Sequence, residues 1–188
     1  MTNSSDNNLL QLPKKLVTET WLKTYEIKGT GLLRILSGSM APLINTGDQI
    51  VIEKIEPAQI GIGDIITFWR EDILITHRVI RKFKREHQLY FIERADTSRH
   101  HSEVEATAVI GRVIKIHKGD DREIAFNTVS WLLFNRLVGI GFLASSSAYD
   151  IGEKIRWVPR PIRRCIGKIF VAAKYVQNKV LSGKMNNV

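Results

Sequence analysis

The stretch SGSMAPLINTGDQIVIEKI, residues 37–55, joins a serine-rich turn to the start of a β-strand. Ser39 lies between a glycine and a methionine, and Pro42 follows three residues later. Gly38 permits a tight backbone and the proline rigidifies the exit, so the turn can hold a hydroxyl in an exposed position. A turn that only ends a strand with two capping serines has the same composition. The turn by itself therefore leaves open whether Ser39 is a nucleophile.

The residues that follow this turn predict a mainly β body. In DQIVIEKI (48–55) isoleucines alternate with polar residues, which is typical of a half-buried strand. Short runs rich in β-branched residues continue the pattern, with turn signals between them and no strand–helix–strand rhythm. The other predicted strands are 32–37, 64–69, 73–80, 88–93 and 108–116, and the turn signals are 45–48, 61–64 and 70–73.

Length and composition predict one catalytic-size domain with appendages. The chain has 188 residues, a hydrophobic content of 44% and a net charge of +9. Its single cysteine, Cys165, excludes an intrachain disulfide and fits a reducing compartment. The first fifteen residues have no basic region followed by an apolar run, so we expect no secretory signal. We predict a polar or helical lead-in over 1–30, a β catalytic domain over 31–118 and a helical region over 119–188.

Most of the positive charge lies in the C-terminal region. Residues 150–188 hold nine Lys and Arg and two acidic residues, a net charge of +7. Such a segment either covers the body with its charges in water or contacts an anionic membrane surface. No strand of the body combines aromatic and basic residues on one face, so we expect no nucleic-acid partner. Apolar residues at helical spacing predict a basic amphipathic helix over 162–181, namely Ile162, Cys165, Ile166, Ile169, Phe170, Ala173, Val176, Val180 and Leu181.

Residues 128–147 are apolar and have about the ~20 residues of a spanning helix. Asn135 and Arg136 lie near the middle of this segment, and charge at that depth in a bilayer is costly. We therefore expect a helix that lies on a surface, with a single C-terminal span as the alternative.

His77 lies within the β-type run ITHRVI, so its ring is either satisfied in the core or faces a site. The pair His100 and His101 has no cysteine or carboxylate at metal-ligand spacing, so we expect no metal site and no cofactor. The remaining histidines, His87 and His117, also lie in polar contexts.

The order of these segments resembles the type I signal peptidases and their wider clan of serine peptidases. The resemblance covers about residues 32–116, and the segments that carry it occur in the family's order. They are SGSMAPL, TGDQIVIEK, IGIGDIITFW, ITHRVI, ERADTSRHHSEV and VIGRVIKI. The implied fold is a signal peptidase-like β body.

The resemblance also implies the roles of individual residues. Ser39 matches the nucleophile and His77 the general base, a position that holds lysine in common bacterial members and histidine in the archaeal and endoplasmic-reticulum-like branch. Asp96 matches a third polar residue that would orient the imidazole. Ser37 and Met40 match positions beside the oxyanion and the substrate.

Three features depart from the family's pattern. Ala95 stands where the family has glycine before the aspartate, and Leu43 stands where threonine often follows the proline. Residues 9–36, where the family has a spanning helix, contain seven charged residues. We therefore expect a membrane-associated or cytoplasmic protein without an N-terminal anchor.

The resemblance implies a serine endopeptidase that cleaves an extended leader- or signal-type peptide or preprotein with a Ser/His dyad supported by aspartate. One alternative is a self-cleaving or non-catalytic regulator of the same clan, although about thirty residues before the first strand are too few for a helix-turn-helix domain. The other alternative is a basic protein that binds a membrane or a nucleic acid.

Overall fold

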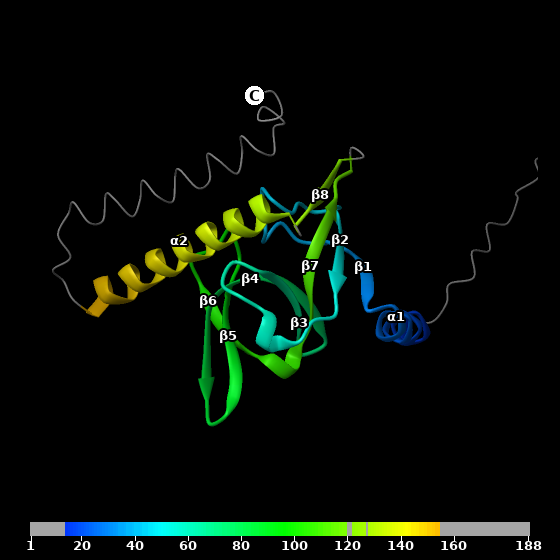
Figure 1. The fold of residues 1–188 in the computed structure, drawn as a ribbon, viewed down its shortest axis with the longest axis horizontal. Coiled ribbons are helices and arrows are strands. Elements are labelled where there is room, and N and C mark those ends of the chain that lie inside the picture. The colour runs from blue at the N-terminus through cyan, green and yellow to red at the C-terminus, as the bar shows by residue number, and fades with distance from the viewer. Residues whose placement is uncertain (1–13, 120–121, 127, 155–188) are drawn as a thin grey trace, which may run out of the picture.

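The computed structural model describes residues 14–119, 122–126 and 128–154, which form one curled antiparallel sheet and two helices (Figure 1). Neighbouring strands follow the order β1-β2-β7-β3-β4-β5-β6, and β8 pairs with β7. The predicted mainly β body is confirmed. The strands are β1 Thr30–Arg34, β2 Gln49–Glu53, β3 Ile65–Arg70, β4 Ile73–Arg85, β5 Gln88–Arg94, β6 His101–Glu105, β7 Val109–His117 and β8 Glu123–Ala125; the helices are α1 Lys14–Lys28 and α2 Val129–Lys154, with short 3-10 turns η1 Pro57–Gln59 and η2 Ala106–Ala108.

The two Gly-Asp turns begin β2 and β3 in the same way. Gly47 and Gly63 have φ values of +93° and +94°, a left-handed backbone that favours glycine. The carboxylate of Asp48 accepts a hydrogen bond from the backbone N–H of Asn45 at 2.7 Å. Asp64 accepts the equivalent bond from the N–H three residues earlier at 2.9 Å. The turn signals at 45–48 and 61–64 are therefore real turns, and each sets the start of a core strand.

The sheet has an apolar cluster on each of its faces. One cluster joins β2, β3 and β7 to the turn after β1 and includes Met40, Leu43 and Ile65. The other includes Phe68 and Phe91 and lies on the face that β3, β4, β5 and β6 share. Because side chains alternate along a strand, consecutive residues of β4 point to opposite faces of the sheet: Val79 belongs to the second cluster, and Ile80 packs against α2.

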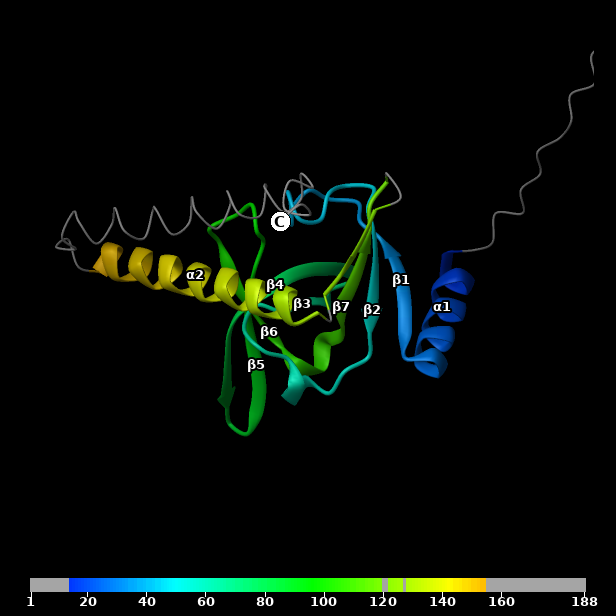
Figure 2. The same cartoon turned by 45° about the horizontal axis from the view of Figure 1, so that its top comes forward.

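Helix α1 lies beside β1 at one edge of the sheet (Figures 1 and 2). The rings of Trp21 and Tyr25 stack with their centroids 5.2 Å apart. The Tyr25 hydroxyl donates a 2.6 Å hydrogen bond to the carbonyl of Ile110 in β7. These contacts attach the lead-in to the β body.

Helix α2 packs closely on the sheet and extends past its opposite edge (Figures 1 and 2). A Cβ atom added to Gly63 would lie 2.2 Å from the Asn135 carbonyl oxygen, and one added to Gly139 would lie 2.7 Å from the Gly63 backbone. The two glycines thus allow direct contact between backbones. Val138 and Phe142 then pack against Ile80 of β4.

This packing confirms the prediction that 128–147 is a helix lying on a surface. In the part of the chain that the structure describes, no helix has the length and apolarity needed to cross a bilayer. The amphipathic helix predicted over 162–181 lies outside the described residues.

Two strands were not predicted, and both are at the periphery. β6 has the polar sequence HSEVE and pairs with β5 alone, whereas β8 has three residues and pairs with β7. An edge strand can be short and polar because only one side of it needs a hydrogen-bonded neighbour. β8 also carries the sheet past residue 118, where we predicted the β body to end.

Candidate active site

The turn after β1 presents two serines above a buried methionine. The Ser37 and Ser39 hydroxyl oxygens lie 3.3 Å apart. Ser37 is exposed and Ser39 is half-buried, whereas Met40 is only 2% exposed and packs with Leu43 and Ile44 in the core. The Met40 side chain therefore anchors the turn inside the protein and is not at a surface that a peptide could contact.

A second loop holds the backbone of this turn. The N–H and the hydroxyl of Thr97 donate hydrogen bonds to the Ser39 carbonyl oxygen at 3.1 and 3.0 Å. The preceding residue, Asp96, forms a two-bond ion pair with Arg78 of β4 at 2.8 and 2.7 Å. Ser39 is thus connected through the 95–98 loop to the residue that follows His77 in the sequence.

Lys118 provides a third attachment for the turn from the end of β7. Its ammonium group donates hydrogen bonds of 2.5 Å to the Leu43 carbonyl and to the Asp48 carboxylate. Both partners lie in the segment between Ser39 and β2, so this lysine fixes the path of the chain after the candidate nucleophile.

His77 lies in β4 with its Nδ1 atom 2.6 Å from Oε2 of Glu93 in β5. Glu93 is 1% exposed, while the His77 side chain is 18% exposed. The register pairs Val79 with Glu93, so Glu93 and His77 are diagonal neighbours on one face of the sheet. A buried carboxylate thus holds a histidine whose side chain is partly open to solvent.

Two further donors surround the Glu93 carboxylate. Ser102 of β6 and Arg70 of β3 donate to Oε1 at 2.5 and 2.8 Å. Burial by itself would raise the pKa of Glu93, but the hydrogen bonds from His77, Ser102 and Arg70 outweigh it, and the net pKa lies below its ordinary value. Glu93 is therefore ionised at neutral pH.

An ionised carboxylate can only accept hydrogen bonds, so the contact with Glu93 fixes the tautomer of a neutral His77. The proton must lie on Nδ1, which donates to Glu93, and Nε2 is left with its lone pair. That is the arrangement of a general base in a serine hydrolase.

The resemblance had led us to expect Asp96 beside His77, but in the described residues Asp96 pairs with Arg78 and His77 with Glu93. The Asp96 carboxylate is 2% exposed and pairs with Arg78, which is 0% exposed and also donates to the Gly63 carbonyl at 3.0 Å and to Oδ1 of Asn135 at 2.8 Å. Arg78 and His77 are consecutive residues of a strand and point to opposite faces. The acid next to the imidazole is Glu93.

The sequence does contain a signal for Glu93 that our interpretation missed. In QLYFIE every second residue, Leu89, Phe91 and Glu93, lies on one face of the strand, and Glu93 follows two apolar residues on that face. A carboxylate at a core position of a strand needs a buried partner. Its partners come from three other strands, so pairing order decides their identity.

In the described residues no hydrogen bond joins the Ser39 hydroxyl to His77. The Ser39 oxygen neighbours that of Ser37, and the His77 contacts are with Glu93 and, edge to face, with the ring of Phe68 at 6.3 Å. Catalytic hydrogen bonds in free enzymes are often long and tighten when substrate binds.

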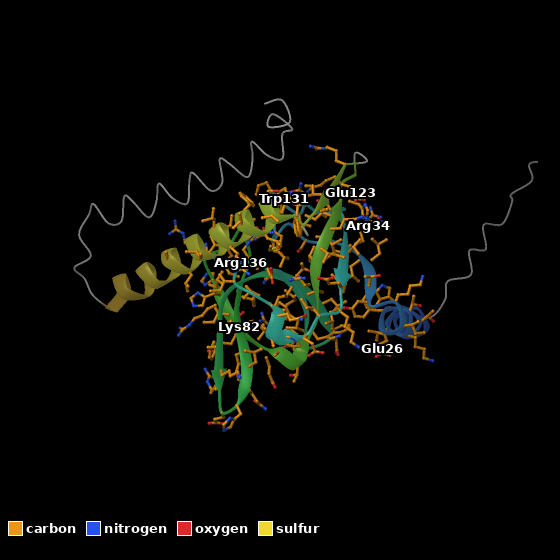
Figure 3. The ribbon with its side chains drawn as sticks, viewed as in Figure 1. Glu26, Arg34, Lys82, Glu123, Trp131 and Arg136 are labelled. Carbon is orange, nitrogen blue, oxygen red and sulfur yellow. The ribbon has the colours of Figure 1, made fainter. Side chains whose placement is uncertain are left out.

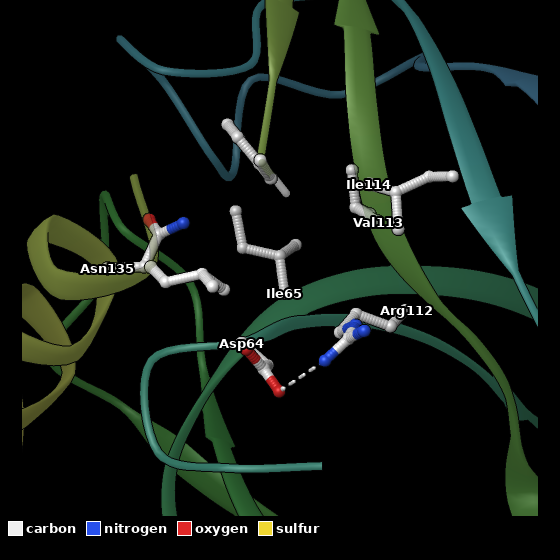
Figure 4. Close-up of a pocket in the computed structure, with 8 residues that line it drawn as sticks. Asp64, Ile65, Arg112, Val113, Ile114 and Asn135 are labelled. Carbon is white, nitrogen blue, oxygen red and sulfur yellow. Dashed lines mark ion pairs between the residues drawn. The ribbon is translucent and has the colours of Figure 1, made fainter. Parts of the chain in front are cut away.

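A pocket of about 190 Å³ lies between β3, β7 and the first turns of α2 (Figure 4). Asp64 and Arg112 face each other across it at 3.6 Å, and Asn135 lies at its α2 side. Neither Ser39, His77 nor Glu93 lines this pocket, so it is separate from the candidate active site. The remaining lining residues are Ile65, Val113, Ile114, Phe126 and Leu132.

Comparison with known proteins supports a relationship to signal peptidases. No protein-family model matches the chain. The chain is 35% identical over 72 residues to Signal peptidase I W of Bacillus subtilis (strain 168), a segment that is 37% of this chain and 38% of that relative. The chain thus aligns with less than half of the relative's length. The similarity supports a relationship between this segment of the chain and signal peptidases.

Proposed function

We propose that the protein is a serine endopeptidase in which Ser39 is the nucleophile, His77 the general base and Glu93 the acid that orients the base. The observation that carries the proposal is the 2.6 Å contact between His77 Nδ1 and the buried Glu93 carboxylate. A buried carboxylate stabilises the imidazolium that forms when the histidine takes a proton. The histidine at this position in turn favours the histidine-base branch of the family, because histidine is neutral near pH 7 without the desolvation that a lysine base needs.

In this mechanism Nε2 of His77 takes the Ser39 hydroxyl proton while the serine oxygen bonds to the scissile carbonyl carbon. The same proton passes to the leaving amine as the peptide C–N bond breaks, which leaves an ester between Ser39 and the acyl part of the substrate. Water, deprotonated by His77, then hydrolyses the ester and restores the serine. The Ser37 hydroxyl, 3.3 Å from the Ser39 oxygen, is suited to donate to the oxyanion.

Asp96 has a positioning role in this proposal. Its ion pair with Arg78 fixes the 95–98 loop, and Thr97 of that loop holds the Ser39 carbonyl. A shift of this loop would therefore move the nucleophile without contact between Asp96 and the reacting atoms.

An extended leader- or signal-type peptide is the substrate class that we propose. A sheet with an exposed edge binds an extended peptide by main-chain hydrogen bonds. β1 and β6 are the two ends of the strand order and each pairs with one strand.

Labelling with a fluorophosphonate probe tests the nucleophile. We expect the full chain to be labelled, Ser39→Ala to lose the label, and Ser37→Ala to keep it at a lower rate. Labelling that survives in Ser39→Ala would remove Ser39 as the nucleophile. A chain that takes no label at any serine would favour the non-catalytic regulator instead.

The basic C-terminal region supports a second part of the proposal, namely contact with an anionic membrane surface. Each Lys or Arg near such a surface contributes about 1 kcal/mol, and salt screens the attraction. We expect the full chain to sediment with anionic vesicles at low salt and to be released at high salt. Replacing Arg163, Arg164 and Lys168 by glutamine should weaken sedimentation, and binding that is insensitive to salt would contradict a charge-driven contact.

A further inference from the structure

Helix α2 has apolar side chains on two opposite faces. The inner face packs on the sheet through Val138 and Phe142. The outer face carries Val129, Leu133, Leu137 and Ile140, which are 54 to 72% exposed. Their spacing of four, four and three residues places them in one stripe along the helix, on the side opposite the buried residues. We call these four residues the outer stripe.

A helix that is apolar on both sides is usually buried on both sides. Arg136 is exposed at the margin of the outer stripe (Figure 3). Trp131, on the inner face, packs against the apolar cluster that includes Met40 and Leu43. The outer stripe is on the side of α2 opposite Val138 and Phe142, so no strand covers it. The outer stripe therefore needs another occupant.

The chain itself continues from the end of α2. Residues 155–188 follow Lys154, and apolar residues at helical spacing over 162–181 predict a second amphipathic helix within them. We propose that residues 162–181 pack antiparallel on the outer stripe of α2.

The connection has the length and composition that this arrangement requires. Residues 155–161 include Pro159 and Pro161, and proline is disfavoured inside a helix but favoured in its first turn. Helix–helix connections of about 2–8 residues join antiparallel neighbours. α2 has 26 residues, a length of about 39 Å, and a 20-residue helix of about 30 Å can lie along it.

The register of such a hairpin brings apolar positions together. If residue 162 lies opposite residue 154, then Val176 lies opposite Ile140, and Val180 lies close to Leu137. The basic residues of the tail are mostly on its other side and stay in water. This arrangement leaves charge, and not apolar area, for any contact with a membrane, and it does not depend on the chemistry of Ser39.

Cys165 gives a direct test because it is the only thiol of the chain and belongs to the apolar side of the tail helix. We expect the full chain, without vesicles, to react with a maleimide at least ~10-fold more slowly than the denatured chain. Leu137→Glu with Ile140→Glu should restore most of that reactivity. The matched control, Ile27→Glu with Ile73→Glu, places the same charges at exposed apolar positions of α1 and of the start of β4 and should leave Cys165 protected.

A disulfide cross-link tests the proposed contact between the tail and the outer stripe directly. In a Cys165→Ser background, Ile140→Cys with Val176→Cys should form an intrachain disulfide on mild oxidation, whereas Ile73→Cys with Val176→Cys should not. A thiol that is open in solution and protected only by anionic vesicles would overturn the proposal in favour of a membrane on the outer stripe. Protection that rises with protein concentration, with disulfides between chains, would overturn it in favour of a second copy.

Discussion

Two consecutive residues of β4 each meet a buried carboxylate, but the surroundings of the two pairs differ. His77 faces Glu93 with 18% of its side chain exposed, and the pair is joined by Ser102 and the half-exposed Arg70. Arg78 faces Asp96 on the other side of the sheet and is completely buried. Its Nε, Nη1 and Nη2 atoms donate hydrogen bonds to Asp96, Gly63 and Asn135, which ties β4 to the 95–98 loop and to α2.

The difference separates a reactive pair from a structural one. Histidine changes charge near neutral pH, and its free ring nitrogen can accept a proton from a neighbour. Arginine keeps its charge, and a closed network with saturated donors has no capacity for proton transfer. The His77 pair therefore suits catalysis, and the Arg78 pair suits the assembly of the site around it. The predictions below test this division.

The largest effect is expected for His77→Ala. Loss of the general base should lower the rate of peptide cleavage by about 10⁴-fold or more, with a small change in the free energy of unfolding. Single-turnover cleavage of a model peptide measures the first quantity, and urea denaturation measures the second. His101→Ala, at an exposed position of β6, is the control and should cleave normally. A rate within tenfold of the native protein would exclude His77 as the base.

Arg78→Met tests the structural pair. The substitution leaves the Asp96 carboxylate buried without its partner, which should lower the free energy of unfolding by about 3–5 kcal/mol. Arg85→Met, which removes an exposed ion pair with Glu103, should cost far less, because water screens an exposed pair. Equal losses in the two variants, measured by chemical denaturation, would mean that the buried network does not support the fold.

Glu93→Gln should lower kcat by about 10²–10³-fold with KM nearly unchanged, because the amide no longer stabilises the imidazolium. Glu93→Asp should recover part of the rate, and Glu103→Gln should change neither parameter.

Asp96→Asn tests whether Asp96 or Glu93 is the acid that acts with His77. It should reduce stability through the lost ion pair with Arg78 and should lower kcat less than Glu93→Gln does. A larger loss of kcat in Asp96→Asn than in Glu93→Gln would assign the orienting role to Asp96, as the resemblance implied.

The smallest effect concerns acid stability. The pKa of Glu93 is lowered in the folded protein, so its contribution to stability is present above the ordinary pKa of glutamate and is lost as pH falls through the folded value. The difference in unfolding free energy between the native protein and Glu93→Gln should therefore shrink on acidification from pH 6. A difference that grows with acid would contradict the lowered pKa.

Much of the β body follows from local sequence. The alternation in 48–55 and the glycines of the two Gly-Asp turns specify strands and turns through side-chain period and backbone conformation, and both effects act over a few residues. The segment 128–147 was predicted as a surface helix for the same reason, because Asn135 and Arg136 interrupt its apolar run. β6 and β8 could not be predicted in this way, since neither has an apolar face.

The candidate site likewise has a part that local sequence indicates and a part that depends on strand pairing. The turn around Ser39 and the polar ring of His77 in an apolar strand make both residues candidates, and the resemblance implies their roles. Sequence alone cannot name the acid next to the histidine, because Glu93 and Asp96 lie only three residues apart at the end of the same predicted strand. Strand pairing determines which of the two carboxylates lies beside His77. The register of β4 and β5 places Glu93 on the His77 face, and the turn after β5 carries Asp96 to Arg78. Partners brought together by long-range pairing are a property of the tertiary structure, because no local interaction distinguishes one carboxylate from the other.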